Sequence, residues 1–152
     1  MQVPTKHLSK PDQAGLLDWI TRKYWPGSLW ALIILLLTGL PGDYFPKVIT
    51  FWDWLTPDKI VHLFIFGVFT FLLLWGYRIQ YLHASKRFTL IRNVFGIGLF
   101  YSGFTELMQA YVFVGRYGNV FDLLANIIGS IIGIGLFMLV MRKNKRGNKS
   151  FI

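Results

Sequence analysis

Apolar residues in this chain gather in four long runs separated by short polar connections. The runs cover about residues 24–40, 60–77, 91–112 and 121–141. Each is close to the ~20 residues that a helix needs to cross the hydrocarbon core of a bilayer. The first run is the weakest, because Pro26 and Gly27 shorten its strongly apolar part. The pattern predicts an all-α integral membrane protein built as a bundle of four transmembrane helices.

The segment before the first run follows a different pattern. Asp12 stands three residues after Ser9, as in a capping box, and apolar side chains then recur at helical spacing. This predicts a short amphipathic helix on the membrane surface, with packing against the bundle as the alternative. No signal peptide is expected, since these residues are polar and lack a small-residue cleavage site. The chain divides into an N-terminal segment (1–23), a membrane domain (24–141) and a basic tail (142–152).

The composition and charge narrow the class of protein. Hydrophobic residues make up 54% of the 152 residues, which is more than an ordinary soluble domain carries. The net charge of +9 is compatible with binding to nucleic acid or to an anionic membrane surface. Because the basic residues stand in short blocks between the apolar runs, membrane lipids are expected as partners and nucleic acid is not. Without cysteine, the chain forms no disulfide or thiolate metal site.

The basic residues also orient the chain. They concentrate in the N-terminal segment, in the connection after the second run and in the C-terminal tail. By the positive-inside rule both termini are cytoplasmic, and the connections after the first and third runs lie outside. Trp52 and Trp54 in the first outer connection fit an aromatic belt at the membrane interface.

Polar residues that are unusual in apolar helices fall at one depth of this topology. Asp58 and His62 share a helical face, as do Asp122 and Asn126, because each pair is four residues apart. At ~1.5 Å per residue the whole set lies within roughly two helical turns of the outer surface. We expect an outward-facing polar pocket made from Asp58, Lys59, His62, Glu106, Gln109, Arg116, Asp122 and Asn126.

Glu106 is the strongest functional candidate in this set. An ionised side chain in hydrocarbon costs at least ~2.5–3.5 kcal/mol, so Glu106 must face the bundle or a water-filled cavity. We expect Glu106 and His62 to do acid–base work or to hold the pocket, with Ser102, Thr105 or water as the available nucleophiles. The remaining members would bind the substrate: Lys59 and Arg116 through an anionic group, and Asp58, Gln109, Asp122 and Asn126 by orienting it.

Alternative interpretations of the same residues stay open. Three carboxylates and an imidazole could hold a divalent metal, but the D-x-x-x-H spacing is weak and no second histidine lies nearby. Neither a metal nor another cofactor is therefore expected. The cluster could instead be an interhelical lock in a structural or interaction protein. Ion-coupled transport is disfavoured, because no series of acidic residues crosses to the cytoplasmic side.

Gly129 and Gly133 are expected to pack the fourth helix against the third, bringing Glu106 near Asn126.

Two stretches carry a family resemblance, "DKIVHLFIF" and "ELMQAYVFVGRYGNVFDLLANIIGSIIG". They contain D-K-x-x-H, E-x-x-Q, an arginine in the outer connection, and D-x-x-x-N-x-x-G-x-x-x-G. With "LTGLPG" at the end of the first run, about residues 35–135 resemble the VanZ-like membrane protein family. The segment before Tyr24 is longer than the family core needs.

The resemblance implies a small multi-span bacterial envelope protein, in a family named after a member linked to glycopeptide (teicoplanin) resistance. It supports a ligand from the cell envelope, lipid-linked or of peptidoglycan type. It implies no particular reaction, and neither the substrate nor the oligomeric state follows from it.

Overall fold

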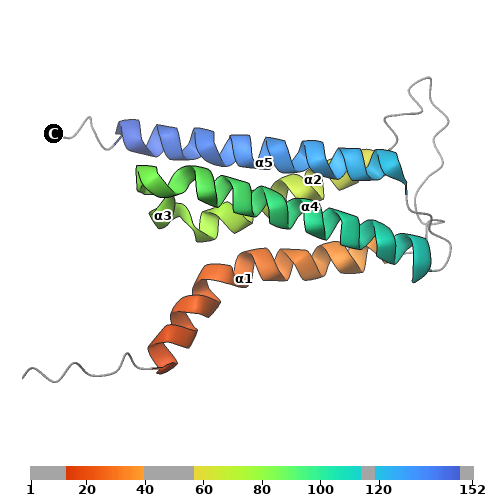
Figure 1. The fold of residues 1–152 in the computed structure, drawn as a ribbon, viewed down its shortest axis with the longest axis horizontal. Coiled ribbons are helices and arrows are strands. Elements are labelled where there is room, and N and C mark those ends of the chain that lie inside the picture. Colours follow the sequence, from red (N-terminus) through yellow and green to blue (C-terminus); the bar gives the residue numbers. More distant parts are fainter. Residues whose placement is uncertain (1–12, 40–56, 114–118, 148–152) are drawn as a thin grey trace, which may run out of the picture.

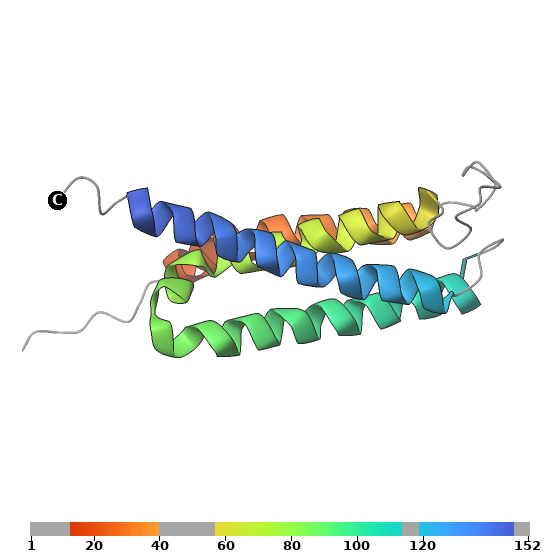
Figure 2. The same ribbon diagram turned by 90° about the horizontal axis from the view of Figure 1, so that it is seen from above.

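The computed structural model describes residues 13–39, 57–113 and 119–147. All regular elements in these ranges are helices: α1 (Gln13–Thr38), α2 (Pro57–Gly76), α3 (Arg78–Leu82), the 3₁₀ turn η2 (Ala84–Lys86), α4 (Arg87–Tyr111) and α5 (Val120–Gly147). The long helices run side by side, and α2 and α5 begin at the end of the bundle opposite α3 (Figure 1). Seen from above, α5 lies between α2 and α4 (Figure 2). The prediction of an all-α chain is confirmed.

The helices extend beyond the apolar runs that predicted them. α4 begins at Arg87 and α5 continues to Gly147, so each includes basic residues outside the apolar window. An apolar run marks only the part of a helix that is apolar enough to lie in the hydrocarbon core. The helical backbone hydrogen bonds continue beyond it through the charged ends. α2 begins at Pro57, and proline suits this position because the N–H that it lacks would have no partner in the first turn. Asp58 follows in the first turn, where the helix dipole stabilises a negative charge.

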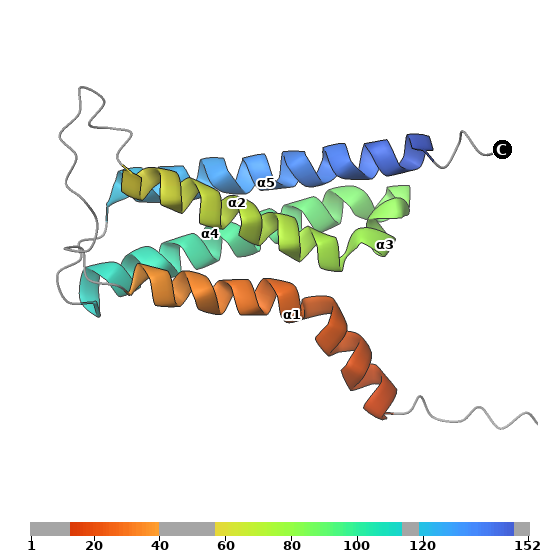
Figure 3. The ribbon, with the colours of Figure 1, turned by 180° about the vertical axis from the view of Figure 1, so that it is seen from behind.

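α1 differs from the sequence prediction. A separate amphipathic helix before residue 24 was expected, but one helix runs from Gln13 to Thr38 with Pro26 inside it. The helix bends, and its N-terminal part leans away from the bundle (Figures 1 and 3). Proline removes one backbone hydrogen bond and crowds the preceding turn, which bends a helix without ending it. Ser9 and Asp12 lie outside the described residues.

Hydrogen bonds from aromatic side chains attach α1 to its neighbours. Trp30 Nε1 donates to the Ile65 carbonyl at 2.8 Å, and the Tyr101 hydroxyl donates to the Ala31 carbonyl at 2.6 Å. Near the bend, the Tyr77 hydroxyl donates to that of Tyr24 at 2.9 Å. Burial and this hydrogen bond raise the pKa of Tyr77 to about 12, so the contact stays neutral over the working pH range. Apolar contacts complete the attachment through Ile34, Ile65, Phe66 and Phe69.

We expect Tyr101→Phe to destabilise the protein by about 1 kcal/mol, because it removes a buried hydrogen bond and leaves the ring in place. Tyr111→Phe is the matched control, since Tyr111 is 84% exposed on the same helix. Unfolding of both variants in detergent measures the difference. Equal stabilities would contradict the role given to the bond between Tyr101 and Ala31.

Close backbone approach joins α5 to α2, which share the largest helix–helix interface among the described elements. A Cβ atom added at Gly129 would overlap the Leu63 carbonyl oxygen, and one at Gly133 would overlap the Gly67 carbonyl oxygen. The Thr70 hydroxyl bridges the same interface to the Ser130 carbonyl at 3.1 Å. The two glycines therefore pack α5 against α2, whereas the sequence pattern had suggested α4 as their partner.

The distribution of polarity across the bundle is inverted relative to a soluble protein. Large apolar side chains are exposed along the helices, with Phe100 77% and Phe88 74% exposed. The buried positions include many polar residues, among them Thr70, Ser102 and Asn126. α2 and residues 120–144 of α5 are long and apolar enough to cross a membrane, and residues 24–38 of α1 form a shorter apolar helix.

Candidate functional site

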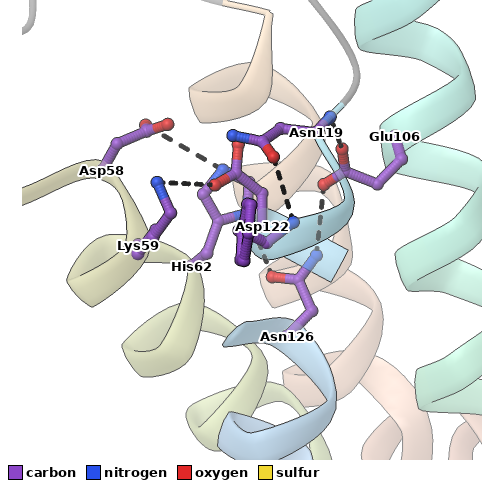
Figure 4. Close-up of polar contacts among 8 residues, drawn as sticks. Asp58, Lys59, His62, Glu106, Asn119, Asp122 and Asn126 are labelled. Atoms are coloured by element: carbon purple, nitrogen blue, oxygen red, sulfur yellow. Dashed lines mark hydrogen bonds and ion pairs between the residues drawn. The ribbon is translucent and has the colours of Figure 1, made fainter. Parts of the chain in front are cut away.

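Polar side chains meet at the end of the bundle where α2 and α5 begin and α4 ends. The close-up in Figure 4 shows them pointing toward one another from these three helices. The group, called here the polar cluster, consists of Asp58, Lys59, His62, Glu106, Asn119, Asp122 and Asn126. The structure thus brings together the sequence-predicted residues of the second, third and fourth runs, apart from Gln109.

A chain of hydrogen bonds crosses the cluster and orients the histidine. Asn126 Oδ1 lies 3.0 Å from His62 Nδ1, and Asn126 Nδ2 lies 3.5 Å from Glu106 Oε1. The carboxylate only accepts, so the amide nitrogen of Asn126 faces it and the amide oxygen faces the imidazole. His62 must then donate from Nδ1, which leaves Nε2 directed at Asp58. Asn126 is fully buried and His62 is 2% exposed, so solvent does not compete for the bond between them, whereas the bond to Glu106 is partly buried.

Asn119 completes the support of Glu106. Its backbone N–H donates to Glu106 Oε2 at 3.0 Å, while its side-chain Oδ1 accepts from the backbone N–H of Phe121 at 3.0 Å. Asn119 therefore caps the start of α5 and holds the carboxylate of α4 at once. Asn119 was not among the residues predicted from the sequence. An asparagine shortly before an apolar run, followed by an acid in the first turn, is a known helix-start signal, and it would have identified Asn119.

Charged pairs occupy the other side of the cluster. Lys59 Nζ lies 3.7 Å from Asp122 Oδ1, and the two side chains are 13% and 7% exposed. His62 Nε2 lies 3.9 Å from Asp58 Oδ1, and the Asp58 side chain is 27% exposed. Within the described ranges the cluster holds the carboxylates of Asp58, Glu106 and Asp122 against the single ammonium of Lys59. The cluster therefore carries an excess of negative charge when all its acids are ionised.

A comparison with known protein families places the chain in one of them. Residues 19–141 match the family described as VanZ/LLP1, and this stretch contains the whole polar cluster. The chain belongs to the VanZ/LLP1 family. No curated protein and no solved structure matches it. Membership in this family and the two apolar helices together indicate a membrane protein.

Two residues that the sequence predicted for the polar pocket, Gln109 and Arg116, are not among the residues of the polar cluster. Arg116 lies outside the described residues. Gln109 is buried against the end of α1, where its Nε2 donates to the Thr38 carbonyl at 3.4 Å. Its Oε1 has no hydrogen-bond partner within the described ranges. Gln109 thus contacts α1, one turn of α4 beyond Glu106.

The two hydroxyls considered as nucleophiles, Ser102 and Thr105, are both buried in α4. The Thr105 hydroxyl donates to the Ser102 carbonyl at 2.9 Å, so it is engaged by its own helix. Ser102 is 1% exposed. The Ser102 hydroxyl has no hydrogen-bond partner within the described ranges. Nε2 of His62 is directed at Asp58, whose side chain is 27% exposed.

Proposed function

We propose that this VanZ/LLP1 protein binds an anionic cell-envelope molecule at the polar cluster, from the outer face of the bacterial inner membrane. The observation that carries the proposal is the convergence of ionisable side chains from three helices at one end of an otherwise apolar bundle. Buried ionisable groups in such a setting are costly and are usually retained for function.

The proposed topology has α1, α2, α4 and α5 as four spans with both termini cytoplasmic. The distribution of basic residues supports it. They lie at the end of the bundle opposite the polar cluster, in α3, in the first turns of α4 and at the end of α5 (Figure 1). They include Arg78, Arg87, Arg92, Arg142 and Lys143. By the positive-inside rule that end faces the cytoplasm and the cluster faces outward.

The features that suit an anion are local. α2 and α5 both begin at the cluster, so the positive ends of two helix dipoles point toward it. Lys59 supplies an ammonium, and Arg116 in the connection between α4 and α5 would supply a guanidinium that binds phosphate or carboxylate in bidentate fashion. Lipid-linked and peptidoglycan-type groups carry such anions and would enter from the outer leaflet.

If the bound molecule is modified, His62 is the proposed proton acceptor. Its Nδ1–H is committed to Asn126, so the lone pair of Nε2 faces the Asp58 side, where the cluster is most exposed. Glu106 acts through Asn126 to hold this tautomer. Asp58 and Asp122 flank the imidazole and would stabilise the imidazolium that forms.

Native mass spectrometry with co-purifying lipids tests the proposal. We expect the wild-type chain to retain an envelope lipid that both Glu106→Gln and Arg116→Ala lose. Arg116→Ala removes the proposed cation for the anionic group, and Glu106→Gln removes the carboxylate that holds the Asn126 amide and the Asn119 backbone N–H in place. Arg92→Ala is the matched control at the cytoplasmic end. Identical lipid spectra for all four proteins would contradict the proposal. In cells, the same two variants are expected to abolish any protection from teicoplanin that the wild type confers.

A second candidate is an interhelical lock with no ligand. It is favoured by the burial of His62 and Asn126, whose hydrogen bonds tie α2, α4 and α5 together. The lock predicts that Glu106→Gln lowers thermal stability in detergent while lipid retention stays as in the wild type. Loss of lipid at unchanged stability would exclude it.

A further inference from the structure

We infer that Asp58, His62 and Asp122 form a binding site for one divalent first-row transition metal ion. One ligand atom from each of the three residues lies within 4.8 Å of the other two. Ligands bound to such an ion at ~2.0–2.2 Å lie roughly 3–3.5 Å from one another. The side chains would therefore close by about 1 Å around the ion, which carboxylates at the first turns of two helices can do by rotating.

Asp122 supplies an independent sign that a cation belongs here. The residue is 5% exposed, and its Oδ1 has no hydrogen-bond partner within the described ranges. The Lys59 ammonium lies 3.7 Å away, longer than a hydrogen bond. A buried carboxylate oxygen without a donor is unusual and calls for a missing partner. A carboxylate oxygen of Asp122 is among the three ligand atoms that lie within 4.8 Å of one another.

The surroundings of His62 match those of a metal-ligating histidine. Such residues use one ring nitrogen for the metal and donate the other N–H to an oxygen, which fixes the ring and its tautomer. Here Nδ1 donates to the buried Asn126 Oδ1 at 3.0 Å, and the Asn126 amide is in turn held by Glu106. Nε2 keeps its lone pair on the side of the two aspartates. A bound ion would take the place of the proton that the proposed reaction gives to this nitrogen. Hydrogen bonding thus prepares the imidazole before any ion arrives.

The ligand set selects the class of metal. Carboxylates alone suit Mg²⁺ and Ca²⁺, whereas imidazole suits zinc, iron, copper and nickel. Two carboxylates with one imidazole therefore favour Zn²⁺ or Mn²⁺, with the remaining positions open. A bound ion would supply a Lewis acid and a positive charge to which an anionic oxygen could bind. The ion would also offset the excess of carboxylates over the Lys59 ammonium within the cluster.

Lys59 and the metal would compete for Asp122. The ammonium lies 3.7 Å from Oδ1 of Asp122, a carboxylate that the ion would also take. Metal binding would therefore displace Lys59 from Asp122. Removing the ammonium should strengthen metal binding, because the ion no longer has to displace a positive charge from this carboxylate. The metal site does not depend on the proposed anionic ligand.

Zinc titration of the full chain tests the inference. The protein is purified in detergent without a histidine tag, stripped with a chelator and titrated with Zn²⁺ alone by calorimetry. Metal content after desalting is measured by mass spectrometry. We expect one Zn²⁺ per chain. Asp122→Asn and His62→Gln should weaken binding at least ~100-fold, beyond the 10–100-fold typical of losing a supporting partner. His83→Gln, between α3 and η2 at the other end, is the matched control and should bind as wild type.

Lys59→Gln tests the competition between the ammonium and the metal for Asp122. This variant is expected to raise the Zn²⁺ affinity about tenfold. If His62→Gln fails to fold, Asp58→Asn replaces it, because the Asp58 side chain is 27% exposed and tolerates the change. No zinc in the wild type, equal affinity in Asp122→Asn, or weaker binding in Lys59→Gln would each overturn the site. Lipid retention without zinc would overturn this inference alone, and zinc binding without lipid would overturn the anionic ligand alone.

Discussion

Gly133→Ala is expected to destabilise the protein by about 1–3 kcal/mol, although alanine is the better helix former. The added methyl group would overlap the Gly67 carbonyl oxygen and lie 2.5 Å from the Thr70 hydroxyl oxygen. Thr70 cannot turn away cheaply, because the one proton of its hydroxyl is shared between the Phe66 and Ser130 carbonyl oxygens, both at 3.1 Å. α2 and α5 would have to separate along the interface that holds the bundle together.

The control lies two residues further on. A Cβ atom at Gly135 would meet nothing within 4 Å, so Gly135→Ala should gain the helix propensity of alanine, about 1 kcal/mol at most. The two substitutions thus change stability in opposite directions on one helix. Thermal unfolding in detergent, followed by circular dichroism, measures both. Equal shifts would mean that α5 does not approach α2 closely at Gly133.

Asn126→Leu is expected to cost about 2–6 kcal/mol, because it removes the partner of two polar groups and each loss costs ~1–3 kcal/mol. His62 Nδ1–H would lose its acceptor in a buried bond, and Glu106 would lose its amide donor in a partly buried one. Unfolding in detergent measures the loss. Asn93→Leu, at an exposed position of α4, is the control and should leave stability unchanged.

A double variant separates the hydrogen bond from side-chain volume. When Asn126→Leu is combined with Glu106→Leu, no buried charge lacks a partner, so part of the lost stability should return. The coupling free energy between the two positions is obtained from the cycle of single and double variants. Strict additivity would contradict the bond between Glu106 and Asn126.

Much of the fold followed from the apolar runs. A helix in hydrocarbon must present apolar side chains all round, so runs of that kind marked α2, α4 and α5 to within several residues. The bend of α1 was not foreseen, because a proline in the first turns of a helix and one inside it look alike in a sequence. Trp30 bonds to α2, and Tyr24 bonds to Tyr77 directly after α2. The apolar pattern does not encode these contacts of the continuous helix α1.

The polar cluster was predictable in membership more than in pairing. Asp58, His62, Glu106 and Asn126 share a depth, and depth can be counted along a helix. Which side chain contacts which depends on the rotation of each helix about its axis. The sequence therefore left open that Lys59 faces Asp122. The helix against which Gly129 and Gly133 pack depends on the same rotation. The sequence pattern suggested α4, whereas the two glycines pack against α2, where Gly67 is a further small residue.

The long-range pairing of α2 with α5 has a consequence for biosynthesis. His62 and Asn126 are 64 residues apart, so at 5–20 residues per second the ribosome makes the partner of His62 roughly 3–13 s later. During that interval the first turns of α2 carry an aspartate, a lysine and a histidine that nothing later in the chain can yet cover. A nascent chain stalled before α5 should therefore be the form most dependent on insertion factors and most exposed to quality-control proteases.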